Sequence, residues 1–181
     1  MLIFPLVWLG RMALDQQPTP SRVAGVATVV HYAMIILLGA AIIRAVLTRQ
    51  AWAGWTLPLP VEIGRFLVMA TEAAALAAVV NLAVKGAGAP IAIALSQKLA
   101  MEWLYAWTRN PMVLATLALL VAVGLWFKSA LFVLWVIDLF APALLFFVKV
   151  YEERELELRF GVPYLPYKSR TPRLFPKRPQ C

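Results

Sequence analysis

Residues 112–150 read "MVLATLALLVAVGLWFKSALFVLWVIDLFAPALLFFVKV". Lys128 and Ser129 divide this stretch into two apolar segments, 112–127 and 130–150. Each segment is close to the roughly 20 residues that an α-helix needs to cross the hydrocarbon core of a bilayer. Because two residues leave room only for a tight turn, the sequence predicts an antiparallel helical hairpin inside a membrane.

The composition points to the same class of protein. Of the 181 residues, 62% are hydrophobic and only 14% are charged, which is too apolar for a soluble domain of this size. The net charge of +8 would suit nucleic acid, but no base-reading motif accompanies it, so we expect no nucleic-acid partner. We also predict no metal site. The single cysteine, Cys181, cannot form an internal disulfide.

Two further segments, 26–47 and 61–84, are long and apolar enough to cross the bilayer. The apolar run in residues 1–12 has no basic residue before it and contains a proline, so we interpret it as a short interfacial or partly inserted helix. The predicted fold is therefore all-α: an integral membrane helical bundle of about four transmembrane helices. It has room for a fifth, short N-terminal helix, and it includes a tight hairpin and a cytoplasmic C-terminal helix and tail.

The basic residues predict the orientation. They gather before the first crossing, between the second crossing and the hairpin, and in the tail: Arg11, Arg22, Lys85, Lys98, Arg109, Arg154, Arg159, Lys168, Arg170, Arg173, Lys177 and Arg178. The opposite side has chiefly Arg49 and Lys128. Because loops rich in lysine and arginine stay inside the cell, we expect both termini and the middle loop to be cytoplasmic.

Residues 151–160, "YEERELELRF", continue the last crossing out of the membrane. At 100° per residue, Leu156 and Phe160 form an apolar stripe, and Glu152 and Glu153 flank it. Two carboxylates at the bilayer edge that face protein suggest a bound cation or a basic partner.

Other polar side chains have structural interpretations. For Glu155, Glu157 and Arg159 we favour a solvated face with weak ion pairs. For His31 and Asn81, which lie within predicted crossings, we favour neutral hydrogen bonds between helices.

A second polar group lies at the start of the hairpin, in "LYAWTRNPMVL", residues 104–114. Pro111 forces Asn110 out of the helical region and can itself begin a helix, so Arg109 and Asn110 would sit at a helix N-terminus with free backbone N–H groups. Such an end attracts anions, and Arg109 adds a positive charge suited to a carboxylate or phosphate. Taken alone, an interfacial arginine is more often an anchor to lipid phosphates. Because the hairpin brings Arg109 to the membrane face of the glutamate pair, the two groups together predict a receptor for a zwitterion.

These motifs resemble the isoprenylcysteine carboxyl methyltransferase and phospholipid N-methyltransferase superfamily in its bacterial, integral membrane form. The resemblance rests on "RNPM" at 109–112, the hairpin, and the pattern "YEE…L…RFG..Y..Y…PR..P" from 151 to 176. In addition, "GAGAP" at 86–90 resembles the segment that opens the cofactor region of bacterial members, and "LYAWTRNPM" resembles their "PYRYVRNPM". The similarity covers residues 85–178, about half of the chain.

The resemblance implies an S-adenosylmethionine-dependent methyltransferase of the bacterial inner membrane, with its cofactor among the helices at the cytoplasmic face. It divides one integrated domain into N-terminal membrane helices, 1–84, and a cofactor-binding catalytic region, 85–181. A glutamate would hold the cofactor's ammonium, Arg109 its carboxylate, and aromatic residues its adenine. The implied cofactor-binding residues are Tyr105, Arg109, Asn110, Pro111, Met112, Glu152, Glu153 and Tyr164. The implied catalytic residues are Arg109, Glu153 and Arg173.

Several positions depart from the pattern that the chain resembles. Trp103 and Leu104 replace a glycine and a proline, Val113 replaces an aromatic residue, and Arg154 stands where proline is frequent. Trp103 bears on the geometry of the loop beside the adenine, and Val113 removes a hydroxyl that could contact the acceptor. These departures are compatible with a divergent acceptor or with a catalytically weak relative, and we favour the divergent acceptor.

Two questions stay open in the sequence. The first is whether the chain is an enzyme at all, because a non-enzymatic scaffold or small transporter subunit could use Glu72 and Asp138 as polar links within a helix bundle. The second is the acceptor. A carboxylate is deprotonated at pH 7 whereas an ammonium group needs a base, and the catalytic half contains no histidine. We therefore favour a prenyl-type or other lipophilic carboxylate, or a thiol, over an amine.

Overall fold

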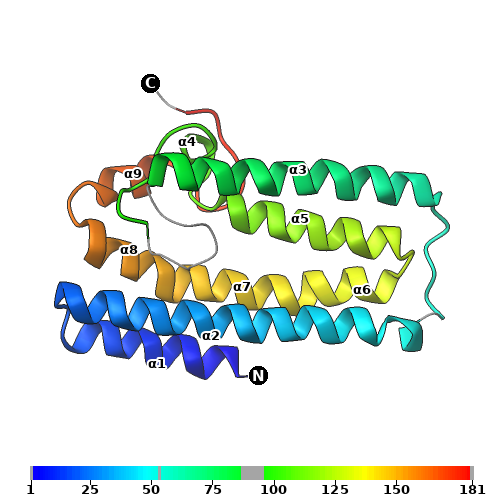
Figure 1. The fold of residues 1–181 in the computed structure, drawn as a ribbon, viewed down its shortest axis with the longest axis horizontal. Coiled ribbons are helices and arrows are strands. Elements are labelled where there is room, and N and C mark those ends of the chain that lie inside the picture. The colour runs from blue at the N-terminus through cyan, green and yellow to red at the C-terminus, as the bar shows by residue number, and fades with distance from the viewer. Residues whose placement is uncertain (1, 53, 87–95, 180–181) are drawn as a thin grey trace.

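The computed structural model describes residues 2–52, 54–86 and 96–179, and Figure 1 shows their longer helices running side by side along one axis. The elements are α1 Ile3–Gln16, α2 Pro20–Leu47, η1 Arg49–Trp52, α3 Val61–Gly86, α4 Leu104–Trp107, α5 Pro111–Trp126, α6 Ala130–Trp135, η2 Val136–Phe140, α7 Ala141–Phe147, η3 Val148–Glu152, α8 Glu153–Phe160 and α9 Tyr164–Arg170. η1 is a 3-10 turn, and η2 and η3 are π-helical turns. The predicted all-α fold is confirmed for these residues.

Three helices are long and apolar enough to cross a membrane: Pro20–Leu47, Val61–Gly86 and Ala130–Phe160. The last of these is the continuous run from α6 to α8. The remaining predicted crossing, 112–127, is the helix α5, but its 16 residues give a length of only about 24 Å against a hydrocarbon core of roughly 30 Å. The architecture is that of a helical membrane bundle in which α5 is shorter than the three helices that are long enough to cross.

One end of this bundle, here called the basic end, is where α2 begins, α3 ends, α5 begins and α8 ends (Figure 1). Arg22, Lys85, Arg109 and Arg159 lie in or beside these helix ends. At the opposite end, residues 127–129 join α5 to α6, so the predicted tight hairpin is confirmed.

The N-terminal apolar run forms α1, a helix of 14 residues that is about 21 Å long and so shorter than a crossing. It packs beside the basic-end half of α2 and against α7 and η3 (Figure 1). Gly10 makes this approach possible, because a Cβ atom there would lie 2.8 Å from Val30 Cγ2 and 3.0 Å from a ring carbon of Tyr151. The short N-terminal helix is therefore an integral part of the packing.

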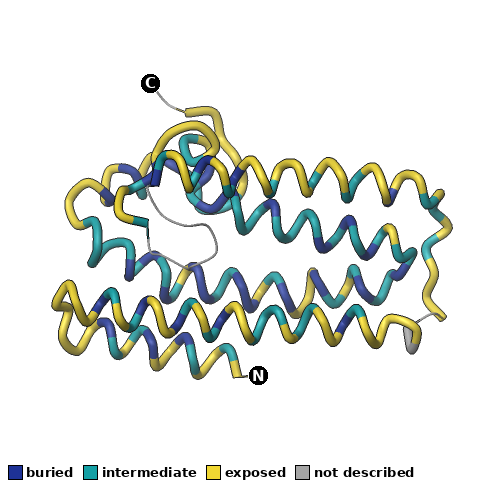
Figure 2. Tube along the Cα trace, in the orientation of Figure 1, coloured by how far each residue is buried: buried dark blue, intermediate teal, exposed yellow. Residues whose placement is uncertain are grey.

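Burial is uneven among the helices, as Figure 2 shows. The core gathers apolar side chains from α1, α2, α5 and the run Ala130–Phe160, whereas α3 is largely exposed and packs on α5. Gly64 brings the α3 backbone against α5, since a Cβ atom at this position would lie 2.5 Å from Trp126 Cα. The contact between α3 and α5 thus depends on a position without a side chain.

We expect Gly64→Ala to destabilise the protein by about 1–3 kcal/mol, because overpacking against a backbone atom forces the two helices apart. Gly39→Ala in α2 is the matched control. A Cβ atom at Gly39 would meet nothing within 4 Å, and alanine favours the helix by up to about 1 kcal/mol. Thermal unfolding in detergent, followed by circular dichroism, measures both effects. Equal unfolding midpoints for the two variants would contradict the close packing of α3 on α5.

Candidate functional site

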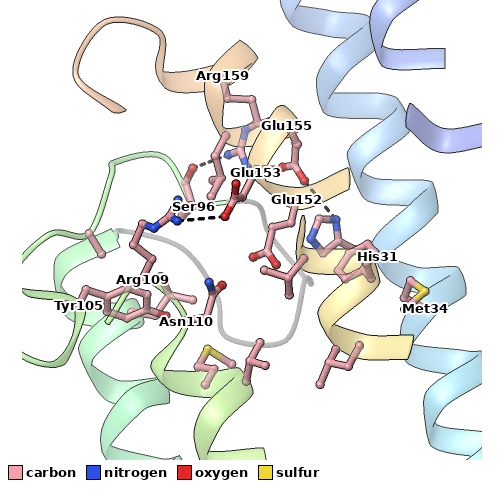
Figure 3. Close-up of a pocket in the computed structure, with 18 of the residues that line it drawn as sticks. His31, Met34, Ser96, Tyr105, Arg109, Asn110, Glu152, Glu153, Glu155 and Arg159 are labelled. Carbon is pink, nitrogen blue, oxygen red and sulfur yellow. Dashed lines mark hydrogen bonds and ion pairs between the residues drawn. The ribbon is translucent and has the colours of Figure 1, made fainter. Parts of the chain in front are cut away.

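A cavity of about 410 Å³ lies at the basic end, between α2, α5 and the run from η2 to α8 (Figure 3). Its volume falls in the roughly 300–1,000 Å³ range of small-molecule sites. Among the residues that the sequence predicted for the site, those lining the cavity are Tyr105, Arg109, Asn110, Met112, Glu152, Glu153 and Tyr164. Pro111 and Arg173, both described by the structure, lie outside the lining.

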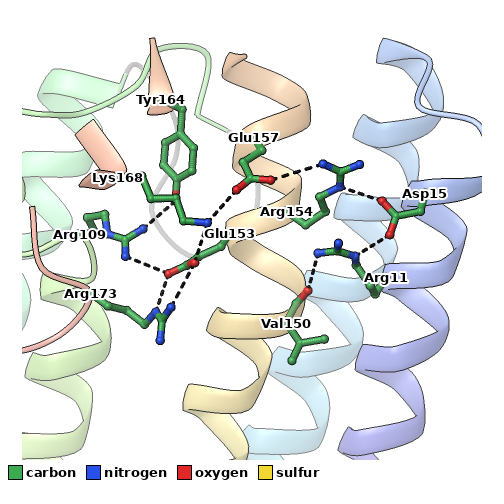
Figure 4. A network of polar contacts seen from close by, with 10 residues as sticks. All are labelled: Arg11, Asp15, Arg109, Val150, Glu153, Arg154, Glu157, Tyr164, Lys168 and Arg173. Atoms are coloured by element: carbon green, nitrogen blue, oxygen red, sulfur yellow. Dashed lines mark hydrogen bonds and ion pairs between the residues drawn. The ribbon is translucent and has the colours of Figure 1, made fainter. Parts of the chain in front are cut away.

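Glu153 is the centre of a polar network at one wall of the cavity (Figure 4). Its carboxylate lies 3.1 Å from Arg109 Nη2 and 3.1 Å from Lys168 Nζ, and it accepts two hydrogen bonds from Arg173. The Glu153 side chain is only 7% exposed and that of Arg109 8%. Three cationic groups therefore surround one buried carboxylate, and Glu153 has no charge left over for a ligand.

The network also fixes the protonation of Lys168. Burial lowers the pKa of the Lys168 amine, but its hydrogen bonds to Glu157 and Glu153 outweigh that effect and raise the pKa above its usual value. Lys168 is thus positively charged at neutral pH. Of this cluster, Arg109 and Glu153 line the cavity, whereas Lys168 and Arg173 lie behind them.

Arg109 is positioned by backbone contacts between its own segment and the C-terminal tail. Its N–H donates to the carbonyl of Pro172 at 2.9 Å. The Asn110 side-chain amide and the Thr108 hydroxyl both donate to the carbonyl of Arg173. Pro111 then begins α5, as predicted. The tail therefore holds the segment before α5, although the side chain of Arg173 itself does not line the cavity.

The guanidinium of Arg109 has a buried N–H donor, on Nε, that no described residue uses. Its Nη1 donates to the Tyr164 hydroxyl at 3.3 Å, and its Nη2 pairs with Glu153. Its buried Nε has no hydrogen-bond partner among the described residues. Because an unsatisfied buried donor is costly, this N–H is suited to an acceptor that a ligand brings.

Glu152 differs from its neighbour Glu153 in every contact. It lines the cavity, where Figure 3 shows it between Arg109 and His31, and it makes no hydrogen bond or ion pair with any residue that the structure describes. Burial, and then the charge of Glu152, raise the pKa of the Tyr105 hydroxyl, which therefore stays protonated. Glu152 is the carboxylate at this cavity that is available for a cationic ligand.

The predicted solvated face is wrong for Glu155 and Arg159. Glu155 is 1% exposed, and its Oε1 accepts a hydrogen bond of 2.7 Å from Arg159 Nη1. The cause is that α8 packs on two sides, against α2 on the side of Glu155 and against α9 on the side of Glu153. A single apolar stripe of Leu156 and Phe160 describes only the middle of this wide buried arc.

The interpretation of His31 as a hydrogen bond between helices is also wrong. His31 Nδ1 lies 2.8 Å from the carbonyl of Ala27 in its own helix, and the ring lines the cavity. Asn81 accepts a hydrogen bond from the backbone N–H of Leu104, so it connects α3 to the start of α4. No local signal in residues 26–47 indicated that α2 faces the site.

Away from the polar wall the cavity is apolar. Side chains from α2, α5 and the run η2–α7 line it, including Ile35, Leu38, Thr116, Phe140 and Leu144. Phe140 lies twelve residues before Glu152, which corresponds to about 18 Å along a helix. The cavity therefore combines a charged end with an apolar part that extends toward the middle of the bundle.

Trp103, the residue that replaces a glycine in the resembled motif, has φ +57° and ψ −120°. Glycine adopts this conformation freely, whereas other residues are strained in it. The backbone thus follows a glycine-like path despite the tryptophan. Glu72 and Asp138 are both exposed, so they do not link helices of this chain. In the "GAGAP" motif, residues 87–90 lie outside the described residues.

No protein-family model matches the chain, and neither a curated protein nor a solved structure matches it at the significance required.

We expect Glu153→Gln to destabilise the protein even without any ligand. Removing one partner of a buried ion pair costs roughly 3–5 kcal/mol, and partial exposure of Lys168 and Arg173 reduces this to about 2–3 kcal/mol. Glu157→Gln, one turn later on α8, is the matched control, because Glu157 pairs with Lys168 and Arg154 near the surface. Its cost should stay below about 1 kcal/mol. Thermal unfolding in detergent measures the destabilisation of each variant. Equal stability of the two variants would refute the central role of Glu153.

Proposed function

We propose that the chain is an integral membrane methyltransferase that uses S-adenosylmethionine to methylate a lipophilic acceptor. The observation that carries this proposal is the unpaired carboxylate of Glu152 beside the partly unsatisfied guanidinium of Arg109, at the charged end of an amphipathic cavity. An anionic and a cationic group that line one cavity are complementary to the amino-acid end of the cofactor.

The residues present fit the cofactor. Glu152 would hold the ammonium, the Nε–H of Arg109 the carboxylate, and Tyr105 and Tyr164 would pack on the adenine. Glu153 acts indirectly, because its charge is already used to fix Arg109. When bound, S-adenosylmethionine supplies an electrophilic methyl group on a sulfonium centre. The protein's own task is to orient the acceptor in line with that group and to exclude water from it.

The apolar part of the cavity supports a lipophilic acceptor. Ile35, Leu38 and Phe140 offer an alkyl or prenyl chain a surface that removes it from water, at about 25 cal/mol for each Å² buried. The reacting group at the end of such a chain would then lie at the charged wall. Lysine and arginine concentrate at the basic end, and by the positive-inside rule this supports a cytoplasmic position for this end in a bacterial inner membrane.

A non-enzymatic scaffold or small transporter subunit is the second candidate. Glu72 and Asp138 favour it, because both carboxylates are exposed on helices long enough to cross a membrane. Carboxylates at such positions are costly in lipid and are suited to a second membrane protein. A scaffold has no need of S-adenosylmethionine, so cofactor binding discriminates between the two candidates.

Isothermal titration of S-adenosylmethionine into the detergent-solubilised protein tests the proposal. We expect binding by the unmodified chain, and a 30- to 1000-fold weaker Kd for Glu152→Gln, because one charged hydrogen bond in a buried site is worth on the order of 2–4 kcal/mol. Glu157→Gln should change binding by less than about 0.5 kcal/mol.

Two outcomes would count against the proposal in different ways. No binding by the unmodified chain at millimolar cofactor would exclude the methyltransferase. Unweakened binding by Glu152→Gln would reject the assignment of the ammonium site. Since Glu152 has no partner among the described residues in the ligand-free protein, Glu152→Gln should unfold at the same temperature as the unmodified chain or at a higher one, unlike Glu153→Gln.

A further inference from the structure

We propose that His31 is the base of this site, and that the acceptor therefore carries a proton on its nucleophilic atom, as a hydroxyl, thiol or ammonium group does. This inference rests on the proposed function. It replaces the sequence-based preference for a carboxylate acceptor, which depended on the absence of histidine from residues 85–181.

His31 reaches the cavity from α2, two turns before Leu38 on the apolar wall. In Figure 3 its ring lies across from Arg109, with Glu152 between them. His31 is also the only histidine in the chain. The ring therefore lies beside both the charged end and the apolar part of the cavity, where the head group of a lipophilic acceptor would reside.

The contacts of the ring determine which nitrogen can accept a proton. Nδ1 lies 2.8 Å from the carbonyl oxygen of Ala27, and because a carbonyl only accepts hydrogen bonds, Nδ1 carries the proton. Nε2 then has a free lone pair, and it makes no hydrogen bond with any described residue. The neutral ring is thus held in the tautomer that can act as a base toward the cavity.

Glu155 is placed to stabilise the ring after it has taken up a proton. Its Oε1 pairs with Arg159, whereas its buried Oε2 has no hydrogen-bond partner among the described residues and lies 3.6 Å from His31 Nδ1. A buried carboxylate oxygen without a partner is costly. A positive charge that forms on the imidazole would offset this cost during the reaction.

The other groups around the ring do not compete for this role. Glu152 is assigned to the cofactor's ammonium, and Glu155 is paired with Arg159. From the helix that carries both glutamates, Phe147 and Tyr151 pack against the ring with their edges or faces, and Tyr151 stays buried. Among the described residues lining the cavity, His31 is the one that carries an imidazole ring.

His31 Nε2 takes the proton from the acceptor's oxygen, sulfur or nitrogen, and the lone pair left on that atom forms the new bond to the methyl carbon. The bond between this carbon and the sulfonium sulfur breaks, and its electron pair stays on sulfur. The imidazolium, beside Glu155, returns its proton to solvent. A carboxylate acceptor is already deprotonated at neutral pH, so its methylation would not require His31 as a base.

The tautomer can be measured without any acceptor or cofactor. Nitrogen NMR of the chain labelled with ¹⁵N-histidine, purified with a tag that contains no histidine, gives one ring and therefore one unambiguous pair of signals. We expect the neutral ring to carry its proton on Nδ1. A neutral ring protonated on Nε2 would overturn the proposal, because that nitrogen could not accept a proton from the cavity.

Methyl transfer from labelled S-adenosylmethionine to three probes of equal chain length supplies the second readout: 4-dodecylphenol, dodecylamine and dodecanoate. We expect methylation of the phenol or the amine, and a loss of about 10²- to 10⁴-fold in His31→Gln, with the Kd for the cofactor changed by less than about twofold. Thr28→Val is the matched control. Thr28 lies on the same helix and bonds the carbonyl four residues before it, but it is exposed.

The possible outcomes separate this inference from the proposed function. Failure of the unmodified chain to bind S-adenosylmethionine overturns the function and this inference together. If the cofactor binds, methylation of dodecanoate alone, or full activity of His31→Gln on the phenol or amine, overturns the role of His31 only. If the cofactor binds but no probe is methylated, the NMR measurement tests the role of His31: a proton on Nδ1 of the neutral ring supports it, and a proton on Nε2 overturns it.

Discussion

The ion-pair cluster around Glu153 holds the basic end together. Arg109 comes from the segment before α5, Lys168 from α9 and Arg173 from the tail, and all three converge on this one carboxylate. Without it, three positive charges, one of them buried and two partly exposed, would lie close together and repel one another. The network continues through Glu157 and Arg154 to α1 (Figure 4). Elements far apart in the sequence are thus positioned by one buried negative charge.

This arrangement gives adjacent glutamates different tasks. Successive residues of a helix point about 100° apart, so Glu153 faces α9 and the tail while Glu152 faces the cavity. Glu152 closes the π-helical turn η3, and such turns occur often at functional sites because they alter the direction of side chains within a helix. Because Glu153 pairs with all three cations, the carboxylate of Glu152 stays unpaired among the described residues and is available to a ligand. On the far side of α8, Glu155 extends the site to α2.

The sequence predicted those features that depend on local pattern. The length of the apolar segments and the pair Lys128–Ser129 were enough to predict the long helices and the hairpin. The antiparallel topology of the hairpin was enough to predict that Arg109 and Glu152 lie at the same site. What could not be predicted depends on packing between distant elements. The apolar residues of α8 indicate a single buried stripe on a helical wheel. In the fold α8 packs against both α2 and α9, so Glu155, which was predicted to be solvated, is buried. His31 was missed for the same reason, because nothing within α2 indicates which of its faces meets the second half of the chain.

The central claim is that Glu153 organises the site and Glu152 together with Arg109 receives the cofactor. The most direct measurement is an experimental structure of the detergent- or nanodisc-embedded protein with S-adenosylhomocysteine, the demethylated cofactor. The account predicts its ammonium within about 3 Å of the Glu152 carboxylate, its carboxylate at Arg109, and Glu153 still surrounded by Arg109, Lys168 and Arg173. A ligand bound elsewhere, or one whose ammonium contacts Glu153 while Glu152 points away from the cavity, would contradict it.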